Sequence, residues 1–63
     1  MTRNQFMQHV AAWQFETKEA AEAALATVGP VDLDSGDGPR PVYYKTTGTW
    51  GVMLDSRARV FGL

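Results

Sequence analysis

The clearest pattern along the chain is a helical repeat of small apolar residues over positions 18–28. Residues three and four positions apart share one face of that repeat, at Ala20, Ala21, Ala24, Leu25 and Val28. Thr17 can cap such a helix with its hydroxyl, and Gly29 followed by Pro30 is typical of a helix end. The pattern predicts one helix, and its alanine-rich face suits close packing on a sheet.

Residues 5–16 fit two periods. A helical period aligns Phe6, Val10 and Trp13 with Thr17, whereas a strand period places Met7, Trp13 and Phe15 on one face. We favour the strand, because a capping residue at Thr17 would have no role inside a long helix and because aromatic residues are common in strands. The sequence therefore predicts an extended segment over residues 7–15, with a helix as the alternative.

Two further strands are expected after a loop rich in Gly, Pro and Asp over residues 29–41. Residues 42–55 are typical of a hairpin whose core face carries Val42, Tyr44, Trp50, Val52 and Leu54. To share that face, Tyr44 must lie opposite Trp50, which requires a three-residue loop over 46–48 with a left-handed Gly48. A turn at residues 56–57 then leads into a last strand over residues 58–63.

These elements predict one α+β domain over residues 1–63, in the order β-α-β-β-β. A single helix packs on one face of a small, mainly antiparallel sheet, and nothing in the pattern covers the other face. The predicted pairing places Tyr43, Met53 and Val60 there, together with Phe6 and Val10. Tyr and Met are enriched in interface cores. We therefore predict a protein-binding surface at Tyr43, Met53, Val60 and the neighbouring Lys45, used for a foreign partner or for a homodimer.

Composition limits the chemistry that so short a chain can perform. The 63 residues include no cysteine and a single histidine, His9, so no thiolate metal site or disulfide can form. The segment from Asp32 through Asp34 to Asp37 contains alternating carboxylates, but Gly36 and Tyr43 stand where a calcium-hand loop needs an oxygen ligand and its closing Glu. No recognisable base and orienting acid accompany the Ser and Thr hydroxyls. We expect no catalysis, no metal and no cofactor.

Charge is divided between the two parts of the chain. Residues 1–37 hold two basic and six acidic residues, whereas residues 38–63 hold four basic residues and one acidic residue. The acidic loop with Asp32, Asp34 and Asp37 can present negative charge to a basic partner. The later part interleaves basic and aromatic residues, which is typical of sheet-type binders of single-stranded nucleic acid. That set, the basis of the alternative function, comprises Arg40, Tyr43, Tyr44, Lys45, Trp50, Arg57 and Arg59.

The beginning of the sequence lacks the basic and apolar regions of a signal peptide, and no apolar run is long enough to cross a bilayer, so we expect a cytoplasmic protein without membrane contact.

This small acidic chain resembles, in size and composition only, the phage-encoded inhibitors of host enzymes, including anti-CRISPR proteins. The leading hypothesis, which rests on the uncovered sheet face, is a non-enzymatic protein-binding module, and the resemblance implies an inhibitor that occludes a functional surface of its partner. Binding of single-stranded nucleic acid is the alternative.

Overall fold

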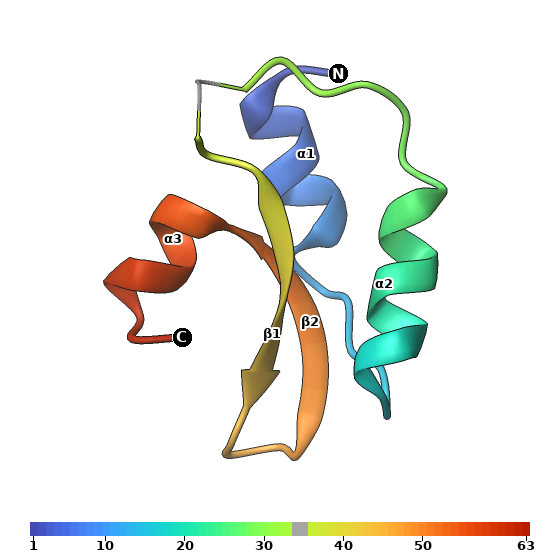
Figure 1. Ribbon diagram of the computed structural model, residues 1–63, viewed down its shortest axis with the longest axis vertical. Helices are drawn as coiled ribbons and strands as arrows, with labels where there is room; N and C mark the ends of the chain where they lie inside the picture. Colours follow the sequence, from blue (N-terminus) through green and yellow to red (C-terminus); the bar gives the residue numbers. More distant parts are fainter. Residues whose placement is uncertain (34–35) are drawn as a thin grey trace.

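The computed structural model describes residues 1–33 and 36–63 and shows an α+β fold (Figure 1). Within these residues the helices are α1 (Arg3–Val10), α2 (Lys18–Ala26) and α3 (Asp55–Val60). The strands are β1 (Pro39–Tyr44) and β2 (Thr49–Leu54). The predicted α+β class is confirmed, but the predicted order β-α-β-β-β is wrong at both ends of the chain, where helices replace strands.

The helix α1 occupies much of the segment for which the sequence favours a strand. Its start is fixed by a reciprocal cap, because the Thr2 hydroxyl accepts the Gln5 N–H at 3.2 Å while the Gln5 side-chain oxygen accepts the Thr2 N–H at 2.8 Å. Phe6 and Val10, four residues apart, are its buried side chains. Extended pairing in this stretch is limited to Phe15, which exchanges two backbone hydrogen bonds of 2.7 Å with Trp50.

The helix α2 begins where the sequence predicts. The Thr17 hydroxyl accepts the Ala20 N–H at 3.1 Å and so satisfies one of the unpaired amides of the first turn. The helix ends at Ala26, two residues before the predicted end, and the hydroxyl of its C-cap Thr27 donates to the Ala24 carbonyl at 2.6 Å. Gly29 does not adopt the expected left-handed backbone.

The hairpin forms, but with a register shifted by one residue. Tyr43 lies opposite Trp50 and Tyr44 opposite Thr49, and the connecting turn has the four residues 45–48. Gly48 has a φ of 68° and donates its N–H to the Tyr44 carbonyl at 2.8 Å, which confirms the predicted left-handed glycine. Because successive side chains point to opposite faces, the shift moves Tyr44 away from the face that carries Trp50.

Gly51 gives a physical reason for this register. A Cβ atom added at Gly51 would lie 2.6 Å from Tyr44 Cε2 and 3.0 Å from the Trp13 carbonyl oxygen. The Tyr44 ring therefore fills the space that a side chain at position 51 would need, an arrangement that the pattern of apolar positions does not reveal.

The helix α3 follows β2 directly, so the predicted strand over residues 58–63 is wrong. Asp55 and Arg59 form an ion pair of 2.9 Å at the i,i+4 spacing that stabilises helices. Gly62, with a φ of 72°, ends this segment, and the Leu63 N–H donates to the Ala58 carbonyl at 2.8 Å.

Helices cover both faces of the sheet, so the predicted arrangement of one helix and one bare face is also wrong. The main core joins α1 and α2 to one face, and α3 lies on the other side of the sheet from α2 (Figure 1). On the α3 side Ala58 is 0% exposed and Val42 is 2% exposed. The buried residues of the main core are Phe6, Val10, Ala21, Val52 and Leu54.

Candidate functional site

A groove of about 400 Å³ lies between α1 and α3, at the end of β2 that leads into α3. Most of the lining is apolar, and Arg57 is the only charged residue among the described residues that form it. The lining residues are Asn4, Met7, Gln8, Val10, Ala11, Tyr44, Val52, Met53, Leu54, Arg57 and Phe61.

The wall from α1 follows from the helical period. Phe6 and Val10 point into the core, so the adjacent face of α1, which carries Asn4, Met7 and Gln8, is left to border the groove. Ala11 continues that face beyond the end of the helix. Met7 also packs against the core cluster, and this contact holds the wall in place.

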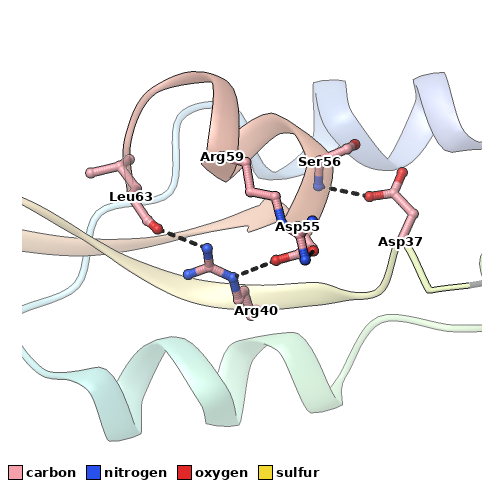
Figure 2. Close-up of polar contacts among 6 residues, drawn as sticks. All are labelled: Asp37, Arg40, Asp55, Ser56, Arg59 and Leu63. Carbon is pink, nitrogen blue, oxygen red and sulfur yellow. Dashed lines mark hydrogen bonds and ion pairs between the residues drawn. The ribbon is translucent and has the colours of Figure 1, made fainter.

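The opposite wall, α3, is fixed by polar contacts with β1 and the segment before it (Figure 2). Arg40 Nε lies 3.0 Å from Asp55 Oδ1, and Arg40 Nη2 donates to the Leu63 carbonyl at 2.7 Å. The second carboxylate oxygen of Asp55 pairs with Arg59. A single arginine on β1 thus connects to both ends of the C-terminal helical segment.

Asp37 supplies a further contact at the start of α3. Its Oδ1 accepts the Ser56 backbone N–H at 2.9 Å (Figure 2), and its Oδ2 lies 3.5 Å from Arg3 Nε. The hydrogen bond from Ser56 is the main cause that lowers the pKa of Asp37 below its ordinary value, and Arg3 adds a smaller effect of the same sign. Asp37 therefore joins α1, the loop before β1 and α3.

The floor of the groove contains Tyr44 and Met53. Burial raises the pKa of the Tyr44 phenol, so this hydroxyl keeps its proton to a higher pH than an exposed phenol does. Met53 is half-buried, on the same face of the sheet as Tyr44 because both alternate with residues of the core face. A flexible thioether beside a fixed aromatic ring gives a floor that can adjust to different apolar groups.

Arg57 lies at the rim of the groove with its guanidinium carbon 5.5 Å from the centre of the Phe61 ring. This stacking orients the guanidinium and leaves the N–H groups at its edge available. Within the part of the chain that the structure describes, no carboxylate pairs with Arg57. Phe61 itself is 57% exposed.

The structure does not bring the predicted binding residues together on one surface. Tyr43 lies opposite Trp50 and Met53 opposite Arg40, so Tyr43 and Met53 point to opposite faces of the sheet. Val60 lies on α3 and is 77% exposed. Lys45 is exposed in the hairpin turn. Of these four, Met53 alone lines the groove.

The charged candidates also have separate places. Asp32 is exposed and donates its backbone N–H to the Met1 carbonyl at 2.9 Å, whereas Asp34 lies outside the described residues. Asp37 and Arg59 are engaged in the internal contacts described above. Arg57 is the secondary candidate that the fold places in the groove.

Two predicted core residues, Trp50 and Tyr44, are only half-buried. Trp50 lies in a row of aromatic rings, with its ring centre 5.2 Å from Tyr43 and its backbone paired to Phe15. Trp13 continues the row, since its ring centre lies 5.7 Å from that of Phe15.

No group of three or more potential metal ligands occurs among residues 1–33 and 36–63. His9 is exposed, and its ring lies in an edge-to-face arrangement with that of Trp13, with 5.4 Å between the ring centres. In the same residues no helix has the length and apolar character needed to cross a membrane.

Sequence reasoning missed Met7, Gln8, Ala11 and Phe61 as site residues. The signals that could have found the first three are the Thr2–Gln5 cap and the i,i+4 spacing of the buried pair in α1.

No protein-family model, curated protein or solved structure matches this chain.

Proposed function

We propose that this chain is a non-enzymatic protein-binding module and that the groove between α1 and α3 is its binding surface. The observation that carries the proposal is the composition of the lining. Met, aromatic residues and Arg are the types enriched in interface cores, whereas Lys, Glu and Asp are depleted there. Met7, Met53 and Phe61 supply the apolar surface, Arg57 supplies the single charge, and acidic residues and lysines are absent from the described lining.

The lining also supports the non-enzymatic part of the proposal. The described lining includes no histidine, carboxylate or lysine, the side chains that most often transfer protons in enzymes, and burial shifts the pKa of Tyr44 above its ordinary value. The groove is thus suited to holding an apolar group and poorly suited to moving protons. That binding inhibits the partner by occluding its functional surface stays a prediction.

A pair of neighbouring variants tests the surface. Phe61→Ser removes an exposed aromatic side chain from the groove, and Val60→Ser removes an even more exposed apolar side chain that does not line it. Partners captured by the wild-type chain from an extract are identified by mass spectrometry, purified and measured by calorimetry. Loss of a central anchor costs about 2 kcal/mol or more, roughly thirtyfold in affinity. We expect this loss for Phe61→Ser alone, and equal affinity of the two variants would refute the proposal.

The aromatic row supports a second candidate, binding of single-stranded nucleic acid. Tyr43 is 42% exposed beside Trp50, and Lys45 follows on the adjacent turn. Exposed rings next to a cation are the elements on which bases stack. Fluorescence titration with an oligothymidylate would then show salt-dependent quenching that Tyr43→Ala removes. Binding that is unchanged in Tyr43→Ala, or no quenching at all, would exclude this candidate.

A further inference from the structure

We propose that the partner segment in the groove carries a large apolar side chain next to a carboxylate, and that Arg57 binds this carboxylate. The inference rests on the proposed protein-binding function and specifies the chemistry of the partner. The occupant is an acidic segment of another protein, and not a basic or purely apolar one.

Charge complementarity at the rim carries the argument. Arg57 is the only charged residue among the described residues of the lining, and the others are apolar or uncharged polar residues. A basic group entering the groove would meet this cation without any compensating acid in the described lining. A carboxylate would instead form charge-assisted hydrogen bonds in a partly dry environment, where such bonds are stronger than in water.

Among the described residues, the acids at the start of α3 and in the segment before β1 pair with residues other than Arg57. Asp55 is shared by Arg40 and Arg59, and Asp37 accepts hydrogen bonds from Ser56 and Arg3. The acids next to α3 are therefore committed to holding the helix in place. Stacking over Phe61 then presents the guanidinium at the rim with the edge donors that match a carboxylate.

The apolar part of the occupant follows from the floor and the α1 wall. Met7, Ala11 and Met53 offer an adaptable apolar surface in the same groove of about 400 Å³ that Arg57 lines. Asn4 and Gln8 stand on the α1 side and can bond the backbone of a bound segment. A segment with a large apolar side chain beside Asp or Glu is the simplest one that matches both the apolar surface and the Arg57 guanidinium.

The methionines allow a direct test on the full chain. Methyl groups labelled with carbon-13 place two reporters in the groove, at Met7 and Met53, while Met1 does not line it and serves as an internal control. The probes are two peptides that differ at one position, Ac-Gly-Asp-Leu-Phe-Gly-NH₂ and Ac-Gly-Lys-Leu-Phe-Gly-NH₂. We expect the acidic peptide to shift both groove methyls and to bind about tenfold more tightly than the lysine peptide.

Matched arginine variants assign the preference. Arg57→Gln should abolish the difference between the two peptides, whereas Arg59→Gln, two residues away and outside the lining, should preserve it. Equal binding of both peptides to the wild-type chain, or a preference that survives Arg57→Gln, would overturn the inference while leaving the groove as a binding surface. Groove methyls that respond to neither peptide also overturn it, and the partner assay with Phe61→Ser then decides whether the proposed function fails as well. Methyl shifts that depend on protein concentration alone would identify the occupant as a second copy of this chain.

Discussion

Truncation of Val10 tests the assignment of residues 3–10 to a helix, because a strand would give a different result. In α1, Val10 is 4% exposed and lies one turn after Phe6, while Gln8 is exposed on another face. In a strand, Phe6, Gln8 and Val10 would share one face. Val10→Ala removes two buried methyl groups at about 0.8 kcal/mol each, and the resulting cavity raises the cost to about 2–3 kcal/mol. Gln8→Ala should change the stability by less than about 0.5 kcal/mol.

Urea unfolding followed by tryptophan emission measures both variants. A chain of this size has a total stability of roughly 3–9 kcal/mol, so Val10→Ala remains measurable where a truncation of Phe6 to alanine would leave little folded protein. With a urea dependence of about 1 kcal/mol per molar, the midpoint should fall by about 2–3 M for Val10→Ala and by less than about 0.5 M for Gln8→Ala. Similar losses for the two variants, or no loss for Val10→Ala, would refute the helical assignment.

Three further changes probe the other elements. Gly51→Ala should cost about 1–3 kcal/mol and displace the Tyr44 ring, which the chemical shifts of that ring would report; an unmoved ring would contradict the packing described above. Thr17→Ala should cost about 1 kcal/mol in thermal or urea unfolding through loss of the α2 cap, and a neutral result would mean that water replaces the hydroxyl. The lowered pKa of Asp37 means that its contribution to stability is present above its ordinary pKa of about 3.9 and is lost as the pH falls through the folded-state pKa. Asp37→Asn should therefore be less stable than wild type near pH 6, with the gap closing toward pH 2, and a gap independent of pH would contradict this account.

The parts of the fold that sequence reasoning found are those with local chemical signals. The Thr17 cap and the glycine at position 48 each act within a few residues, so both were predictable. The cap made by Thr2 and Gln5 is equally local, but the alternating aromatic residues after it also fit a strand. Periodicity alone could not decide between the two, because the deciding fact is the contact of Phe6 and Val10 with β2.

The candidate site was less predictable because its parts come from distant segments. The register depends on how Tyr44 packs over Gly51, and α3 depends on contacts that reach back to Arg40 on β1. A six-residue segment such as α3 has weak helical preference by itself. Because α1 and α3 were both predicted as strands, the predicted fold contained no groove between them. Met53 was identified from the uncovered sheet face, and Arg57 from the basic and aromatic residues of the later part of the chain.

The attachment of α3 has a consequence for the dynamics of the domain. Of its six residues, all of them described, Ala58 is the buried one, and the polar contacts that attach the helix to β1 and to Asp37 are partly exposed. Elements with little apolar burial open in local fluctuations while the rest of the fold stays intact. Amide hydrogens in residues 55–63 should thus exchange faster than those of the main core. Since α3 forms one wall of the groove, an occupant bridging both walls would slow that exchange, and this weakly protected helix would become a sensitive indicator of binding.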